Sequence, residues 1–147
     1  MLADIRIRPA VRGDVAQISR FLTENELPTV GIEKCVENFV VAQDRNGSWV
    51  GVAGLEVYGK SGLLRSVAVG QRFRGMGQGR SLVDSILRNA KAKGLERIYL
   101  LTDTAQAYFS GLGFEVVNRK DIEEAVKASP EFPECGEAAA TMRKLIS

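Results

Sequence analysis

Hydrophobic residues recur along this chain with two different periods, and the two periods alternate from one segment to the next. Runs in which apolar residues dominate or alternate with polar ones predict β-strands, whereas apolar residues spaced three and four positions apart predict helices. Strands are predicted at residues 5–10, 39–43, 49–59, 62–70, 97–102, 113–118 and 138–146. Helices are predicted at residues 14–22, 32–36, 82–94 and 104–110, and residues 122–128 form a further segment of mixed polar and apolar character.

The connections between these segments indicate how the strands are arranged. Asn46 and Gly47 supply a tight turn that joins two strands as a hairpin, and the strand at residues 62–70 follows almost directly. The strand at residues 97–102 is instead reached through a long helix, so the order differs from that of a doubly wound parallel fold. We therefore predict an α/β fold with a mixed, mostly antiparallel twisted sheet of six to seven strands and helices on both faces.

Size and composition set the expected organisation and location. The chain has 147 residues, of which 45% are hydrophobic, so we expect one domain over residues 1–147 with one sizeable core. It has no apolar run of 18 residues or more, and its first residues lack the apolar stretch of a signal peptide. These features predict a cytoplasmic protein that does not enter a membrane.

The residue inventory excludes several kinds of chemistry. The chain contains no histidine, which removes histidine-dependent nucleophilic catalysis and most catalytic zinc sites, and we expect no metal. Cys35 and Cys135 are far apart and form no CxxC motif, so ordinary reduced thiols are expected. A net charge of only +2 argues against a nucleic-acid partner.

The segment RGMGQGR, residues 74–80, places three glycines between arginines directly before a predicted helix. Glycines permit positive φ angles and a close backbone approach, and a helix N-terminus presents unpaired N–H groups to an anion. The segment therefore predicts an anion site, with a flexible, solvated turn as the alternative. It differs from a P-loop, because Met76 stands where lysine is needed, and from a GxGxxG fingerprint, because Arg80 stands where glycine is needed.

Two neighbouring segments, LLRSVAV and RGMGQG, resemble the signature of the GNAT superfamily of acetyl-CoA-dependent N-acetyltransferases. Further segments similar to this family are IRPAVRGDVAQI, VGVAGLEVYG and AQAYFSGLGF, so the resemblance covers essentially the whole chain. GLEVYG, GLLRSVAV and LLTDTAQAYFSGLGF are also similar to arsenic-resistance acetyltransferases of the superfamily, and the last of them to the acetyltransferase domain of N-acetylglutamate synthases.

The resemblance implies that acetyl-CoA binds with its pyrophosphate on the glycine-rich turn and its pantetheine arm along the preceding strand. The strand backbone would pair with the pantetheine like an added strand, and its N–H groups would polarise the thioester carbonyl. In the alternative reading the strand's valines only fill the core. The residues implied in cofactor binding are Val67, Ala68, Val69, Arg74, Gly75, Met76, Gly77, Gly79, Arg80, Thr102 and Phe109.

The resemblance also implies that an amine attacks the thioester directly, without a covalent enzyme intermediate. Glu56, in an otherwise apolar strand, is the candidate base for the amine, and a solvent-facing strand glutamate is the alternative. Tyr108 is the candidate general acid, because Phe109 occupies the position where the family often has a tyrosine. Leu63 stands where some members carry a catalytic glutamate, which leaves the role of base to Glu56.

Arg65 is the candidate determinant of the acceptor. Strand alternation predicts its side chain on the same face as those of Val67 and Val69, and a buried arginine needs an anionic partner. That partner is Glu56 in one reading and a substrate carboxylate in the other. We expect acetyl transfer to the primary amine of a small molecule, an amino acid or an analogue, and allow for a homodimer. The alternatives are a non-catalytic acyl-CoA sensor and N-acetylation of peptides or proteins.

Overall fold

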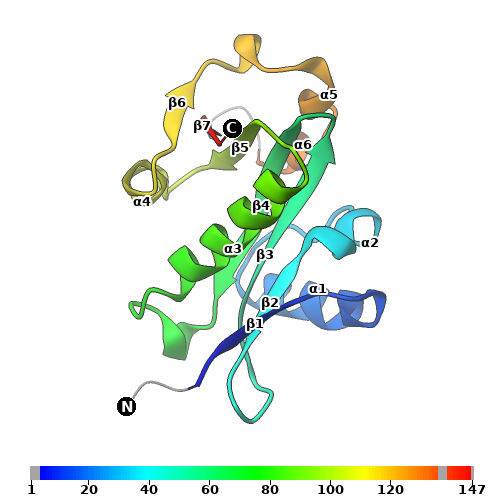
Figure 1. The fold of residues 1–147 in the computed structure, drawn as a ribbon, viewed down its shortest axis with the longest axis vertical. Coiled ribbons are helices and arrows are strands. Elements are labelled where there is room, and N and C mark those ends of the chain that lie inside the picture. The colour runs from blue at the N-terminus through cyan, green and yellow to red at the C-terminus, as the bar shows by residue number, and fades with distance from the viewer. Residues whose placement is uncertain (1–3, 136–138, 147) are drawn as a thin grey trace.

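The computed structural model describes residues 4–135 and 139–146, and the strands within them form one seven-stranded sheet (Figure 1). The order across the sheet is β1-β2-β3-β4-β5-β7-β6. Strands β4 and β5 are parallel and the other neighbouring pairs are antiparallel, which confirms the predicted mixed, mostly antiparallel sheet. The strands are β1 (Arg6–Pro9), β2 (Val40–Gln43), β3 (Trp49–Tyr58), β4 (Ser61–Val69), β5 (Arg97–Thr102), β6 (Glu115–Val117) and β7 (Ala140–Leu145).

Helices and short 3-10 turns connect most of the strands, whereas β2, β3 and β4 follow one another directly. The sequence pattern predicted most of these segments, but it did not predict α6. The strand expected at residues 138–146 begins at Ala140, and residue 138 lies outside the described residues. The helices are α1 (Val15–Glu24), α2 (Ile32–Cys35), α3 (Gln78–Ala92), α4 (Gln106–Gly111), α5 (Glu124–Lys127) and α6 (Glu131–Cys135).

The sheet is covered on both faces, as predicted. Helix α3 lies across β3 and β4 in Figure 1 and packs its apolar stripe, which includes Leu82 and Ile86, against one face. Helices α1 and α2 pack against the other face, where Ile18 and Ile32 share a core with Phe39. Because the apolar stripe of each helix is on one side only, each helix is amphipathic and its polar side remains in water.

Strand β4 contains a β-bulge at its centre. Gly54 pairs with Arg65 and Val52 pairs with Ala68, so two residues of β4 face a single residue of β3. One of the two is Ser66, whose φ of 61° lies in the left-handed region that non-glycine residues rarely adopt. The extra residue interrupts the alternation of side chains along the strand.

The bulge makes the predicted facing of Arg65 wrong. Val67 and Val69 pack against the core under α3, whereas the Arg65 guanidinium lies 6.0 Å from the ring of Phe39 in the core under α1 and α2. Residues two positions apart share a face only in a regular strand, and the bulge inserts one residue between Arg65 and Val67.

Strands β4 and β5 pair over only part of their length. Their register joins Ser61 to Arg97 and Leu63 to Tyr99, after which β4 continues to Val69 without this partner. The far half of β4 therefore has a free backbone edge where it faces β5. A gap of this kind exposes unpaired N–H and C=O groups to any ligand that enters it.

Candidate active site

A groove runs along β4 toward the N-terminus of α3. Its volume is about 820 Å³, and we call it the α3 groove. One wall is formed by β4, the floor by the turn before α3, and the other wall by α4. The lining residues are Val67, Val69, Phe73, Arg74, Gly75, Gly77, Gln78, Gly79, Arg80, Ala105, Ala107, Tyr108, Phe109, Gly111 and Leu112.

The turn before α3 presents backbone amides to the groove. Gly75 and Gly77 have φ angles of 81° and 79°, which side chains other than glycine's adopt only with strain. The bond from Ser81 N to Gly77 O opens the helical ladder, so the N–H groups of Gln78 and Gly79 have no acceptor within the helix. Together with the positive end of the helix dipole, these amides favour an anion at this point.

Arg74 connects this turn to two other elements. Its Nε donates to the carbonyl of Val69 at 3.0 Å, and its Nη2 donates to Oδ1 of Asn25 at 2.9 Å. The guanidinium thus holds the turn against the end of β4 and the C-terminal cap of α1 while it lines the groove. Asn25 was not predicted, because it follows a helix far away in the sequence and belongs to no motif.

A second cavity opens in the gap between the diverging halves of β4 and β5. Its volume is about 580 Å³, and we call it the β4/β5 pocket. Val67, Ala105 and Phe109 line both this pocket and the α3 groove, so the two cavities adjoin. The lining residues are Asn25, Glu26, Leu27, Pro28, Leu64, Arg65, Ser66, Val67, Leu100, Leu101, Thr102, Asp103, Thr104, Ala105, Phe109 and Glu131.

The predicted site residues divide between these cavities, the core and the surface. Ala68 is buried under α1 and α2, and the side chain of Met76 is exposed to solvent. Thr102 lies in the β4/β5 pocket, where its hydroxyl accepts a hydrogen bond from Ala105 N at 2.9 Å and so stabilises the start of α4. The other predicted cofactor residues line the α3 groove: Val67, Val69, Arg74, Gly75, Gly77, Gly79, Arg80 and Phe109.

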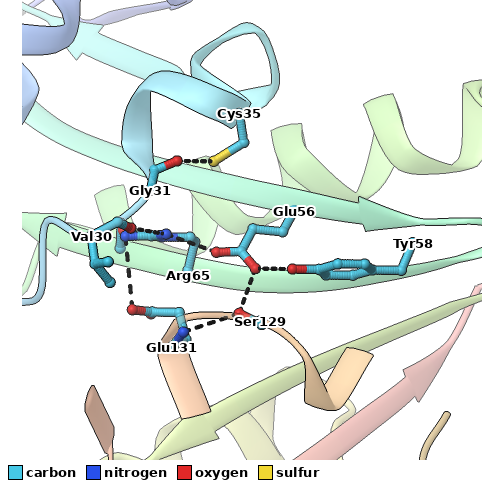
Figure 2. A network of polar contacts seen from close by, with 9 residues as sticks. Val30, Gly31, Cys35, Glu56, Tyr58, Arg65, Ser129 and Glu131 are labelled. Atoms are coloured by element: carbon cyan, nitrogen blue, oxygen red, sulfur yellow. Dashed lines mark hydrogen bonds and ion pairs between the residues drawn. The ribbon is translucent and has the colours of Figure 1, made fainter. Parts of the chain in front are cut away.

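Arg65 and Glu56 form a buried ion pair, shown in Figure 2. Arg65 Nη1 lies 2.7 Å from Glu56 Oε2 and also donates to the carbonyl of Val30 at 2.6 Å. The Arg65 side chain has no exposure and Glu56 is 6% exposed, so the alternative of a solvent-facing Glu56 is wrong. The alternative in which Glu56 is the partner of Arg65 is confirmed.

The other carboxylate oxygen of Glu56 accepts hydrogen bonds from two hydroxyl groups. Tyr58 Oη and Ser129 Oγ each lie 2.5 Å from Oε1 (Figure 2). Burial, together with the bond to Glu56, raises the pKa of Tyr58 to about 12, so this phenol remains a donor at neutral pH. Burial likewise raises the pKa of the nearby Cys35 thiol to about 11, which makes it a poor nucleophile.

The segment that follows β6, residues 119–135, supplies a second carboxylate to Arg65, and we call it the C-terminal segment. Glu131 Oε2 lies 3.7 Å from Arg65 Nη2, a guanidinium nitrogen without a hydrogen-bond acceptor among the described residues. In Figure 2 Ser129 and Glu131 approach from the side opposite to α2. The need of Arg65 for an anion was evident from its apolar strand, but nothing in the sequence connected it with Glu131.

A family model described as "Acetyltransferase (GNAT) family" matches residues 6–114. The matched region includes both walls of the α3 groove and the glycine-rich turn. The chain belongs to this family. The mixed sheet and the adjoining cavities described above are thus features of a member of the GNAT family. The C-terminal segment that carries Glu131 lies beyond the match.

Proteins similar to this GNAT chain include acetyltransferases of amino acids. The amino-acid acetyltransferase of Mannheimia succiniciproducens is 27% identical over 93 residues, which cover 62% of this chain and 21% of that protein. The chain thus spans about a fifth of the length of this relative.

Solved structures show the same GNAT fold. N-acetylglutamate synthase from Neisseria gonorrhoeae, complexed with coenzyme A and N-acetyl-glutamate, superposes with a TM-score of 0.84 at 19% identity, covering 100% of this chain and 36% of that one. Rv2747 from Mycobacterium tuberculosis, in complex with CoA, gives a TM-score of 0.80 at 22% identity, covering 97% and 99% of the two chains.

Two further properties of this GNAT chain concern its described residues. Within residues 4–135 and 139–146, no helix is long and apolar enough to cross a bilayer. The same residues contain no group of three or more cysteine, aspartate or glutamate side chains arranged to hold a metal ion.

The two aromatic residues of α4 occupy different places in this GNAT site. The hydroxyl of Tyr108 lies over Gly79, where a Cβ atom would come within 2.7 Å of it, so this phenol borders the glycine-rich turn. Phe109 lies where the α3 groove meets the β4/β5 pocket and has no proton to donate. Burial raises the pKa of Tyr108, which keeps its hydroxyl protonated at neutral pH.

Proposed function

We propose that this chain is an acetyl-CoA-dependent N-acetyltransferase that acts on the primary amine of a small molecule, an amino acid or an amino-acid analogue. The observation that carries the proposal is that the α3 groove and the β4/β5 pocket adjoin at Val67, Ala105 and Phe109. A cofactor in the groove and an acceptor in the pocket would meet at this junction. Such an arrangement brings two reactants together in one ternary complex.

The groove supports acetyl-CoA as the cofactor by its shape and its donors. The pyrophosphate would bind to the amides of residues 77–79, with Arg80 and Arg74 as adjacent cations. The pantetheine arm would follow the free edge of β4 beyond Leu63, where the backbone has no β5 partner. An amide-bearing chain can pair with such an edge as an added strand does.

The acetyl transfer would take place where the α3 groove meets the β4/β5 pocket. A thioester carbonyl placed beside Val67 would be polarised by free backbone N–H groups of β4, and an amine in the pocket would attack its carbon. The C–S bond then breaks and the sulfur leaves as a thiolate. Because a free thiol has a pKa of about 8.5, the thiolate can take its proton from solvent, and Phe109 is no obstacle to turnover.

The acceptor class rests on the size of the pocket, on Arg65 and on the relatives. A pocket of about 580 Å³ admits a small molecule. The buried Nη2 of Arg65 offers a donor to a carboxylate or a similar oxyanion, including that of an arsenic-containing or phosphorus-containing amino-acid analogue. The Mannheimia relative is named an amino-acid acetyltransferase, and the Neisseria structure is of an N-acetylglutamate synthase with N-acetyl-glutamate bound.

Thiol release from acetyl-CoA tests the proposal. The panel comprises amino acids, their decarboxylated amines, oxyanion analogues and short peptides, with calorimetry of coenzyme A binding in parallel. We expect coenzyme A to bind and amino acids to outperform the matching amines. Binding without turnover on any amine would instead support an acyl-CoA sensor, and a preference for peptides would overturn the small-molecule assignment.

A further inference from the structure

The β4/β5 pocket carries more acidic than basic side chains. Among its described lining residues, Glu26, Asp103 and Glu131 are carboxylates, and the one cation is Arg65, which pairs with Glu56 as well as with Glu131. Glu26 and Asp103 are exposed, whereas Glu131 is 6% exposed. Carboxylates therefore outnumber cations at this pocket, and a lining of one sign of charge favours a positively charged group. We propose that Glu131 binds the ammonium group of the acceptor and takes its proton during acetyl transfer, an inference that rests on the proposed function.

Glu56 is less suited to this role than the sequence indicated. Its Oε2 is bonded to Arg65, and its Oε1 accepts the hydroxyls of Tyr58 and Ser129. Glu56 also lines a different cleft, beneath α2, together with Cys35. A carboxylate whose oxygens already accept three donors, and which borders another cavity, is poorly placed to take a proton from an amine.

The network of Glu56 instead positions Glu131. The backbone N–H of Glu131 donates to Ser129 Oγ at 3.1 Å, and Ser129 in turn donates to Glu56. Arg65 lies 3.7 Å from Glu131, beyond hydrogen-bond distance, so it attracts this carboxylate more weakly than it attracts Glu56 at 2.7 Å. Glu56 is therefore a positioning residue that acts through Ser129 and Arg65.

The step balances without a further reactant. The ammonium nitrogen loses one proton to Glu131, and its electron pair forms the bond to the thioester carbon. The C–S bond breaks with its electrons on sulfur, the nitrogen loses a second proton to solvent, and the thiolate gains one. The products are an amide, a free thiol and one net proton, which Glu131 returns to solvent.

Glu131→Gln tests this assignment, because glutamine keeps the shape of the side chain and loses its charge and basicity. We expect kcat/KM for the best amine to fall about 100-fold at pH 7, and the loss to shrink as pH rises and more of the amine is already neutral. Affinity for coenzyme A, measured by calorimetry, and the thermal midpoint should stay close to those of the parent. Glu131→Asp should retain part of the activity.

Glu124→Gln is the matched control, because Glu124 is an exposed glutamate of the same C-terminal segment that lies outside the pocket lining. We expect it to behave as the parent does. An unchanged pH profile of Glu131→Gln, a parallel loss of coenzyme A affinity, or an equal loss in Asp103→Asn would overturn the assignment. If the parent protein releases no thiol with any amine, the proposed function itself fails; if it is active and Glu131→Gln matches it, only this inference fails.

Discussion

Arg65 is a single residue on which several parts of the site depend. Its side chain has no exposure, and its nitrogens contact Val30, Glu56, Ser66 and Glu131. A buried cation is stable only when anions and acceptors surround it. The residue therefore connects the loop before α2, strand β3 and the C-terminal segment at one point.

Removal of this cation should destabilise the fold. Arg65→Leu leaves Glu56 and Glu131 buried without their counter-charge, and we expect the free energy of unfolding to fall by about 3–5 kcal/mol. The double variant with Glu56→Leu removes the paired charge as well, and it should lose less than the sum of the two single variants. Urea denaturation measures both. Additive losses of unfolding free energy would show that Arg65 and Glu56 have no interaction energy.

The glycine-rich turn and the start of α1 show how elements depend on local geometry. The turn requires left-handed φ angles at its glycines, and α3 begins there with unpaired amides. Helix α1 begins instead beside a charged pair, in which Arg8 Nη1 and Nη2 lie 2.8 Å and 3.1 Å from the two oxygens of Asp14. Asp14 also accepts the N–H of Val11. The start of α3 thus lies in the groove, whereas the start of α1 lies beside an ion pair.

Gly77→Val should abolish or weaken coenzyme A binding at least about tenfold, because the branched side chain disfavours the φ of 79° and covers the amides. Gly47→Val is the matched control, since Gly47 has a φ of 82°, an equally open surrounding and a place in the β2–β3 turn away from the groove. Both variants should lose similar stability. Calorimetry should detect weaker coenzyme A binding only in Gly77→Val.

Asp14→Asn should destabilise the protein in a pH-dependent way. The hydrogen bond from Arg8, against the effect of burial, lowers the pKa of Asp14 below its usual value. The stabilisation is therefore present above the unfolded pKa of about 3.9 and is lost as pH falls through the folded pKa. We expect a loss of about 1–2 kcal/mol at pH 7 that disappears at the acid end, measured by urea unfolding across pH. A difference that stays constant with pH would contradict this cause.

At the scale of the whole molecule, one sheet joins both cores. Clusters on the two faces share strands β2, β3 and β4, and Ser129 and Glu131 contact β3 and β4 through Glu56 and Arg65. Loss of the packing on one face would therefore weaken the strands that also support the cluster on the other face. We therefore predict that residues 1–147 unfold as a single domain.

The measurement compares far-ultraviolet circular dichroism with the fluorescence of Trp49, which lies at the start of β3. The two urea transitions should coincide. If coenzyme A binds as proposed, a concentration of about 100 times Kd should add about 2.7 kcal/mol to the unfolding free energy reported by both probes. Separate transitions would contradict the single-domain prediction. If coenzyme A shifted the transition of one probe alone, its site would lie in a part of the molecule that unfolds separately.

Most of the elements, the glycine-rich turn and the family could be predicted from the sequence alone. Apolar periodicity depends on neighbours within a few residues, so most strands and helices were predictable, and so was the open helix start at Gly77. The resemblance of LLRSVAV and RGMGQG to the GNAT signature was confirmed over residues 6–114. The sequence also indicated that Arg65 needs an anionic partner, and of the two partners that it left open, Glu56 and a substrate carboxylate, the structure shows the pair with Glu56.

Tertiary structure alone decided which faces and which distant segments meet. The bulge at Ser66 turned Arg65 to the face opposite Val67, since one inserted residue reverses the alternation and no local pattern marks it. Strand β7 lies between β5 and β6, and Ser129 reaches Glu56 across 73 residues. Such contacts depend on how the chain closes over long loops, a property of the folded whole that neighbouring residues do not encode.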